Sequence, residues 1–187
     1  MALRNAILAA LLDGESSGYD LAKEFDASVA NFWMATPQQL YRELDRMTAE
    51  GLIETRVVQQ ERRPNKRLHS LTEVGHAALH EFVASESKPT AIRDELMVRV
   101  QSMQTVDAPA VRVAVEEKRE WAVAKLARYE RLRSRLLAGR TEQAYLEEAE
   151  RVGPYLTLMR GISFEQENIR WSEFALAVID RRISAQV

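Results

Sequence analysis

The feature that most constrains the fold of this chain is a change in the spacing of its apolar residues at Gly51. Residues 3–50 carry apolar side chains every three or four positions, which is typical of amphipathic helices. Residues 52–60 are instead rich in β-branched side chains, which favour a strand. Residues 61–65 contain Pro and Asn and predict a turn, and residues 67–71 can pair back as a second strand. A β-hairpin is therefore expected after a group of helices.

The helix directly before this hairpin has clear start and stop signals. Thr36 can serve as the N-cap, Pro37 suits the first helical position, and Gln39 stands where a capping box has Glu or Gln. Gly51 suits the C′ position that ends a helix. Further helices are expected over residues 3–13, from residue 19 to about 25, and from residue 72 to about 85, with a break at residues 16–18. This order of elements is that of a winged helix-turn-helix.

The second half of the chain shows no strand signals beyond a polar segment at residues 85–89 that ends in proline. Helices are expected there over residues 90–103, 109–137, 141–151 and 154–184. We therefore predict a mainly α protein, with a winged helix-turn-helix DNA-binding domain at residues 1–86. Residues 87–187 would form an all-helical dimerisation and effector domain with long helices.

The last of these helices carries two apolar stripes. One stripe contains Phe164, Trp171, Phe174 and Val178. The other contains Leu158, Ile162, Ile169, Leu176, Ile179 and Ile183. Because a surface helix of a monomer needs only one apolar face, two faces predict packing on its own domain and on a partner. A central helix of a monomeric bundle is the alternative. The residues expected at a homodimer interface, including two from the opening helix, are Leu3, Ile7, Leu158, Ile162, Ile169, Trp171, Leu176, Ile179 and Ile183.

Charge distribution points to nucleic acid, although the net charge of −2 does not. Four of the six residues at positions 62–67 are basic: Arg62, Arg63, Lys66 and Arg67. Such charges at a hairpin tip repel one another unless an anionic surface neutralises them. This basic cluster follows a helix whose polar side presents Gln38, Gln39, Arg42 and Arg46. Because Gln can pair with adenine and Arg with guanine in the major groove, this helix is the candidate recognition helix.

Other functional classes receive less support. The chain has no cysteine, which excludes disulfides, thiolate metal sites and thiol nucleophiles. It has no apolar run close to the roughly 20 residues that cross a bilayer, its start does not resemble a signal peptide, and it has no glycine-rich phosphate loop. We expect a cytoplasmic protein that is not an enzyme and needs no cofactor.

Two alternatives remain open. Glu73, His76 and His80 share one face of a predicted helix, so that a catalytic metal site or a metal-responsive regulator is geometrically possible. The long helices could also form an interaction scaffold that never touches DNA. If a small-molecule effector exists, Trp33, Trp121 and Trp171 could line its pocket, between the domains or at the dimer interface.

A set of short motifs follows in order along nearly the whole chain. They are the opening 3–12 helix, Gly18-Tyr19-Asp20-Leu21-Ala22-Lys23, Phe32-Trp33, Thr36-Pro37-Gln38-Gln39-Leu40-Tyr41-Arg42-Glu43-Leu44, Glu50-Gly51-Leu52-Ile53, Arg63-Pro64-Asn65-Lys66, Ser70-Leu71-Thr72-Glu73-Val74-Gly75, Arg160-Gly161-Ile162, Trp171 and Phe174-Ala175-Leu176. With these motifs the chain resembles the PadR family of bacterial transcriptional regulators, specifically the longer members with a helical, virulence-activator-like C-terminal domain.

This resemblance implies a homodimer that binds a palindromic operator, often as a repressor, and responds to a small molecule. It implies that Tyr19 and Tyr41 reach phosphates, that residues 36–42, including Thr36 and Pro37, enter the major groove, and that the wing with Asn65 contacts the flanking backbone or minor groove. The sequence departs from the family pattern at two positions. His69 stands where an aromatic is common, which is expected to perturb the wing slightly, and His76 stands where an arginine is common.

Overall fold

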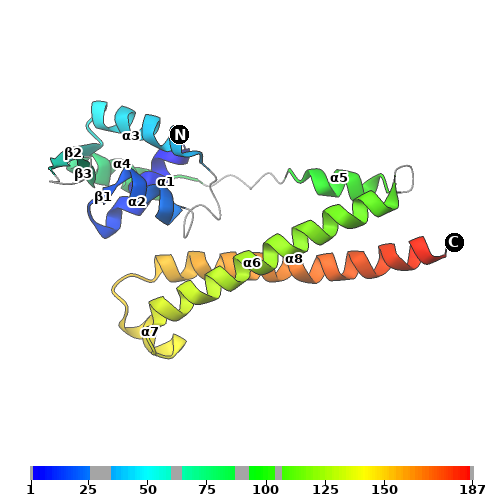
Figure 1. Ribbon diagram of the computed structural model, residues 1–187. Helices are drawn as coiled ribbons and strands as arrows, with labels where there is room; N and C mark the ends of the chain where they lie inside the picture. Colours follow the sequence, from blue (N-terminus) through cyan, green and yellow to red (C-terminus); the bar gives the residue numbers. More distant parts are fainter. Residues whose placement is uncertain (1, 26–34, 60–64, 87–92, 104–106, 186–187) are drawn as a thin grey trace. The chain divides into compact units, whose positions relative to one another are not determined.

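The computed structural model describes residues 2–25, 35–59, 65–86, 93–103 and 107–185 (Figure 1). The chain divides into two compact units, residues 1–88 and residues 89–187. Within the described residues, no helix combines the length and the apolar character needed to span a membrane. The structure is mainly helical with one small sheet, as predicted.

The N-terminal unit contains the helices and the hairpin that the sequence predicts. Its elements are α1 (Ala2–Ala10), a 3₁₀ turn η1 (Leu11–Asp13), β1 (Ser16–Ser17), α2 (Gly18–Phe25), α3 (Pro37–Ala49), β2 (Ile53–Val58), β3 (Lys66–Leu71) and α4 (Glu73–Ala84). The sheet has the order β1-β3-β2, and both pairings are antiparallel. The short strand β1 was not predicted, since residues 16–18 read as a break. β3 is therefore the central strand of the sheet.

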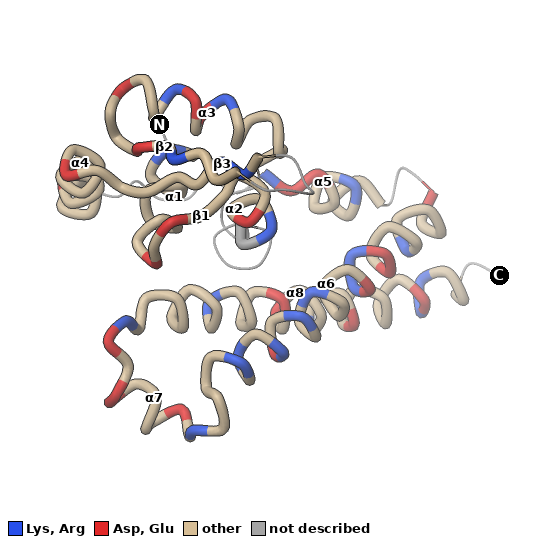
Figure 2. The backbone as a smooth tube through the Cα atoms, turned by 60° about the vertical axis from the view of Figure 1, so that its left-hand side comes forward, with Lys and Arg blue, Asp and Glu red and all other residues tan. Residues whose placement is uncertain are grey.

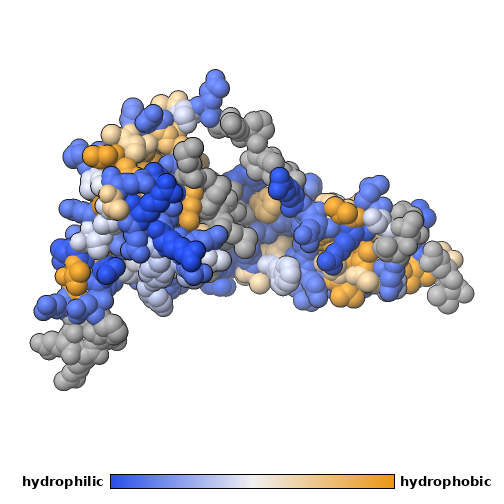
Figure 3. All heavy atoms as spheres, turned by 90° about the horizontal axis from the view of Figure 1, so that it is seen from above, coloured by the Kyte–Doolittle hydropathy of each residue, from blue (hydrophilic) through white to orange (hydrophobic). Residues whose placement is uncertain are grey.

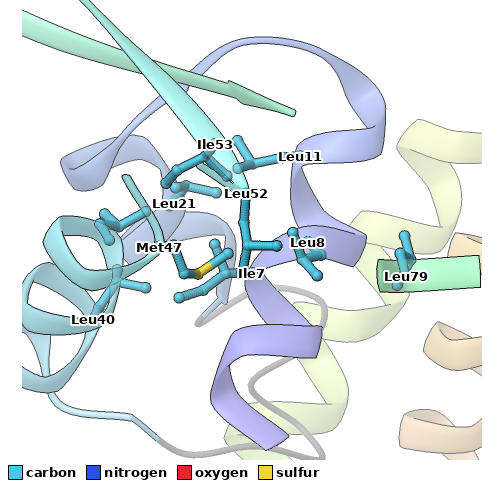
Figure 4. Close-up of a cluster of buried hydrophobic side chains, with 10 residues drawn as sticks. Ile7, Leu8, Leu11, Leu21, Leu40, Met47, Leu52, Ile53 and Leu79 are labelled. Carbon is cyan, nitrogen blue, oxygen red and sulfur yellow. The ribbon is translucent and has the colours of Figure 1, made fainter. Parts of the chain in front are cut away.

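The core of this unit collects the apolar stripes of its helices around the start of β2 (Figure 4). Its buried members are Ile7, Leu8, Leu11, Leu21, Leu40, Leu44, Met47, Leu52, Ile53 and Leu79. Removing a buried leucine side chain from such a core costs about 2–5 kcal/mol. This burial therefore holds α3 in place and turns its opposite face to solvent.

The predicted signals at both ends of α3 are confirmed. The Gln39 backbone N–H donates to the Thr36 hydroxyl at 3.2 Å, and the Thr36 backbone N–H donates to the Gln39 side-chain oxygen at 2.9 Å. Together these bonds form a capping box. Gly51 has φ +72°, the left-handed conformation that glycine adopts without strain. The helix thus stops where the chain turns into β2.

The C-terminal unit is entirely helical in its described part. It contains α5 (Glu95–Gln101), α6 (Ala108–Leu137), α7 (Glu142–Glu148) and α8 (Gly153–Ser184). The two long helices pack antiparallel through two apolar clusters. Val115 at the start of α6 meets Leu176 near the end of α8, and Tyr129 later in α6 meets Ile162 early in α8. The unit is a long helical hairpin with shorter helices at its ends.

Most of the residues expected at a homodimer interface pack within their own unit. Ile7, Leu158, Ile162, Leu176 and Ile179 are all buried in the core of their own unit, because the stripe that contains four of them packs on α6. Leu3, Trp171 and Ile183 are partly buried against the same clusters, and Ile169 is also half-buried. The apolar surface left on the long helices lies elsewhere. Its largest members are Trp121 of α6 and Phe164 and Phe174 of α8, which are 71%, 47% and 67% exposed.

Candidate nucleic-acid interface

The solvent face of α3 is built from residues three or four positions apart. Since a helix turns 100° per residue, burial of Leu40, Leu44 and Met47 directs Gln38 and Arg42 to the opposite side. Both of these side chains are exposed, and so is Asp45 one turn further on. Basic and acidic residues are interspersed along this helix (Figure 2). The face can thus offer an amide and a guanidinium to a partner, next to one carboxylate.

Two predicted base-contacting residues of α3 are engaged within the protein. The side-chain oxygen of Gln39 accepts the Thr36 N–H in the capping box, which orients this side chain toward the start of the helix. Arg46 donates from Nε to Glu50 at 2.9 Å. Glu50 also pairs with Arg4 of α1 at 2.7 Å, and these two guanidinium groups hold the pKa of the Glu50 carboxyl below its usual range. Both residues thus have structural roles in this protein, and base readout by them stays a prediction.

The described part of the wing contacts acidic residues of the neighbouring helices. Lys66 Nζ lies 2.8 Å from Asp20 Oδ2 of α2, and the Ser17 hydroxyl donates to the same oxygen at 2.7 Å. The hydrogen bond from Lys66, followed by that from Ser17, lowers the pKa of the Asp20 carboxyl. Arg67 lies 3.8 Å from Asp45 of α3, with both side chains largely exposed. Arg62 and Arg63, the other basic residues predicted for the wing, lie outside the described residues.

Two tyrosines stand at the start of α2 and on α3. Tyr19 and Tyr41 are both exposed, although large aromatic side chains such as these are often buried. A Cβ added to Gly18 would lie 2.4 Å from the Tyr41 ring. Only glycine therefore leaves the ring where it is, lying against the first turn of α2. Both tyrosines line the same cavity as the basic side chains of Lys66 and Arg67.

These side chains converge on one cavity of about 800 Å³. It is lined from α2 by Tyr19 and Asp20, from α3 by Tyr41 and Asp45, and from the hairpin by Asn65, Lys66, Arg67 and His69. Hydroxyl, amide, ammonium and guanidinium donors in one concave surface suit an anionic ligand such as a phosphate. Sequence reasoning missed the two acids. Asp20 could have been found from its position three residues after Ser17, and Asp45 from its position one helical turn after Arg42.

The other candidate sites do not assemble in the same way. Among the described residues, no three His, Asp or Glu side chains are placed to hold a metal ion, so Glu73, His76 and His80 do not converge. Of the three tryptophans, Trp33 lies outside the described residues. Trp171 packs against a core cluster, whereas Trp121 lines a cavity of about 590 Å³ formed by α5, α6 and α8.

Comparison with known proteins assigns the chain to a family. Residues 7–81 match the family of PadR-like transcriptional regulators, and residues 92–180 match the virulence activator alpha C-terminal family. A Mycobacterium tuberculosis protein named a probable transcriptional regulator is 33% identical over 193 residues, which cover 97% of this chain and 100% of that protein. The chain belongs to the PadR-like family of transcriptional regulators. The predicted resemblance is thus confirmed.

Solved structures of relatives extend this similarity to three dimensions. The Bacillus subtilis negative transcriptional regulator PadR is 28% identical over 96% of this chain and 98% of its own length. Its crystal structure in complex with operator DNA matches with a TM-score of 0.76, over 96% of this chain and 99% of that one. A structure of the same relative in complex with p-coumaric acid matches with a TM-score of 0.70. The Vibrio cholerae virulence activator AphA is 29% identical, with a TM-score of 0.68, over 96% of this chain and 99% of that one.

Proposed function

We propose that this PadR-like regulator is a homodimeric repressor that binds a palindromic operator with residues 1–86 and pairs two copies through residues 87–187. The observation that carries the DNA-binding part is the convergence of Tyr19, Tyr41, Lys66 and Arg67 on one cavity beside α3. A B. subtilis relative binds operator DNA in its crystal structure. We place the protein in the cytoplasm, where operator DNA is accessible.

The two parts of the surface have separate tasks in this proposal. Gln38 and Arg42 enter the major groove and contact base edges, because they stand near the start of α3 and point away from the core. Thr36 and Pro37 bring the first turn of the helix close to a phosphate. Tyr19, Tyr41 and the wing residues Asn65, Lys66 and Arg67 contact phosphates or the minor groove. The same role is proposed for Arg62 and Arg63.

The homodimer is supported by apolar surface on the helical unit. Figure 3 shows hydrophobic residues (orange) on the surface of the helical unit at the right of the view. The exposed aromatic side chains of its long helices are Trp121, Phe164 and Phe174. Exposed phenylalanine and tryptophan side chains are enriched where a second protein covers them. We therefore propose Trp121, Phe164 and Phe174 as interface residues in place of the buried stripe. Two copies would present two recognition helices, and the operator would be an inverted repeat.

A small-molecule effector is proposed for the cavity that Trp121 lines. Its wall combines this indole and Phe164 with lysines and acidic residues. Lys118 pairs with Asp94 at 2.6 Å and Lys125 pairs with Glu165 at 3.1 Å. An aromatic carboxylate would pack on the two rings and compete with these acids for the lysines. The B. subtilis relative binds p-coumaric acid in one of its structures. Titration with that compound is expected to change tryptophan fluorescence in wild type and much less in Trp121→Phe. An equal change in both proteins would remove Trp121 from the proposed site.

Selection from a library of random DNA duplexes tests the proposed DNA binding. The wild-type protein should enrich an inverted repeat. Arg42→Ala should relax the preference at particular base pairs, whereas Arg46→Ala is the matched control on the same helix and should keep it. A reporter driven from the enriched site then separates repression from activation. No enrichment with wild type would favour the scaffold alternative instead.

A further inference from the structure

His69 occupies the middle of the central strand of the sheet. It pairs with Thr55 of β2 on one side and with Ser16 of β1 on the other. Its side chain is only 5% exposed, and it lines the cavity shared by α2, α3 and the hairpin. A histidine was expected to perturb the packing of the wing. The ring is instead buried and hydrogen-bonded, so the imidazole is accommodated by specific polar partners.

These partners form a chain of hydrogen bonds from the hairpin to α3. His69 Nδ1 lies 3.0 Å from Thr55 Oγ1, and Thr55 Oγ1 lies 3.1 Å from Thr48 Oγ1. The Thr48 hydroxyl lies 2.9 Å from the backbone carbonyl oxygen of Leu44. The chain thus runs from β3 through β2 and ends on the backbone of the candidate recognition helix.

The last acceptor of this chain, the Leu44 carbonyl oxygen, determines which atom donates in each hydrogen bond. A carbonyl oxygen only accepts, so the Thr48 hydroxyl donates to Leu44 and must accept from Thr55. Thr55 then has no proton left for the ring and accepts from it. The Nδ1 atom of His69 is therefore the donor, and in the neutral ring Nε2 carries the lone pair. Each hydroxyl is used once as donor and once as acceptor.

We propose that His69 is a positioning residue for DNA binding, which sets the wing against the recognition helix through its Nδ1–H and the hydroxyls of Thr55 and Thr48. The proposal rests on the proposed function of this surface. The wing and the recognition helix must be held in one position relative to each other to contact the same duplex. A shift of either element weakens the contacts of the other.

Leu52 and Ile53 fix the base of the hairpin in the same core as α3, whereas the described tip of the wing contacts the helices through ion pairs. The ion pairs of Lys66 with Asp20 and of Arg67 with Asp45 are exposed, and salt screens pairs of this kind. Both cations are also the groups that phosphates would attract, so DNA competes with Asp20 and Asp45 for them. The chain from His69 to Leu44 carries no charge, and none of its members is among the residues that we propose to contact DNA. These hydrogen bonds therefore hold the hairpin in a fixed position against α3 while the ion pairs rearrange.

A double-mutant cycle on the full-length protein separates positioning from folding. Thr55→Val removes the central hydroxyl with little change in volume and is expected to weaken binding to the selected operator about 5-fold to 10-fold. In an Arg67→Ala background the same change should cost at most about 2-fold, because Thr55 acts through the wing. Ser70→Ala is the control: it removes a bond between the same two strands, to Glu54, from the other face of the hairpin. It should leave binding unchanged.

Two further measurements test the proposal if a variant of the cycle fails to fold. His69→Asn retains a donor near the Nδ1 position and should bind better than His69→Phe, which retains the ring without the donor. Nitrogen chemical shifts of wild type should show the proton on Nδ1, with or without DNA. Additive effects in the cycle, an equal loss in Ser70→Ala or a proton on Nε2 would each overturn the proposal. Failure of wild type to bind any duplex would instead overturn the proposed function itself.

Discussion

The face made by α3 and the hairpin and the face made by α6 and α8 differ in what they leave exposed. On α3 the buried residues are Leu40, Leu44 and Met47, and the exposed side is polar and charged. On the long helices the residues outside the two core clusters include Trp121, Phe164 and Phe174, which are exposed. A charged surface suits an association that salt can reverse, whereas exposed aromatic rings are stabilised by lasting burial. Apolar periodicity therefore locates the cores of both units, while the residues outside each core indicate the kind of partner.

The largest expected effect follows from placing charges on the aromatic face. Phe164→Asp combined with Phe174→Asp should convert a dimer into monomers, because an interface cannot bury unpaired carboxylates. Operator affinity should fall on the order of 100-fold or more, since two linked recognition helices become independent. Analytical ultracentrifugation and fluorescence anisotropy measure the two effects.

The matched control for this pair is Leu176→Ala, which alters the buried stripe of the same helix. It should lower the free energy of unfolding by about 2–5 kcal/mol and leave the dimer intact wherever the protein is folded. A wild-type protein that sediments as a monomer at micromolar concentration would contradict the difference between the two faces.

A smaller effect is expected for the recognition helix. Arg42→Ala should reduce discrimination at one base pair of each half-site by about 1–3 kcal/mol. Affinities for single-base operator variants measure this discrimination, with Arg46→Ala as control because its guanidinium pairs with Glu50. An equal loss of affinity for every sequence would mean that Arg42 contacts phosphate only.

The wing should change the salt dependence more than the sequence preference. Lys66→Ala combined with Arg67→Ala removes up to four phosphate contacts from a dimer, and each contact contributes about 0.9 to the slope of log affinity against log salt. The double variant should therefore bind several-fold more weakly at low salt and show a shallower slope, with its ranking of sequences unchanged. An unchanged slope would show that this pair serves only Asp20 and Asp45.

The smallest effect concerns acid stability. Burial, and then the nearby charge of Arg67, lowers the pKa of His69, while Asp45 opposes the shift; Lys66 and Asp20 line the same cavity. Because the unfolded chain then binds a proton more readily than the folded one, the free energy of unfolding should fall as the pH drops below the usual histidine value of about 6.5. Denaturant titrations between pH 7 and pH 5.5 should show this loss in wild type. It should be smaller in both His69→Asn and His69→Phe.

Most elements could be predicted from the sequence, because their signals are local. The capping box of Thr36 with Gln39 and the left-handed Gly51 are examples in which a few neighbouring residues decide the structure. The strand β1 could not be predicted in this way. It is two residues long and exists because Ser16 and Ser17 pair with β3, more than 50 positions away in the sequence.

The site was less predictable, because side-chain partners come from distant positions. Gln39 and Arg46 have the chemistry of base-reading residues, but the capping box and Glu50 already engage them. Similarly, the stripe that contains Leu176 reads as a possible interface until α6 is known to cover it. The role of His69 depends on Thr55 and Thr48, which three-dimensional pairing alone brings to the ring.

We propose that α3 reads DNA and that the helical unit pairs two copies of the protein. Binding stoichiometry and affinity, measured on the selected operator and on a duplex with one half-site scrambled, test both parts together. For wild type we predict two chains per intact operator and a large loss of affinity when either half-site is scrambled. The Phe164→Asp, Phe174→Asp variant should show neither. Equal affinity of wild type for the intact and the half-scrambled duplex would contradict the account.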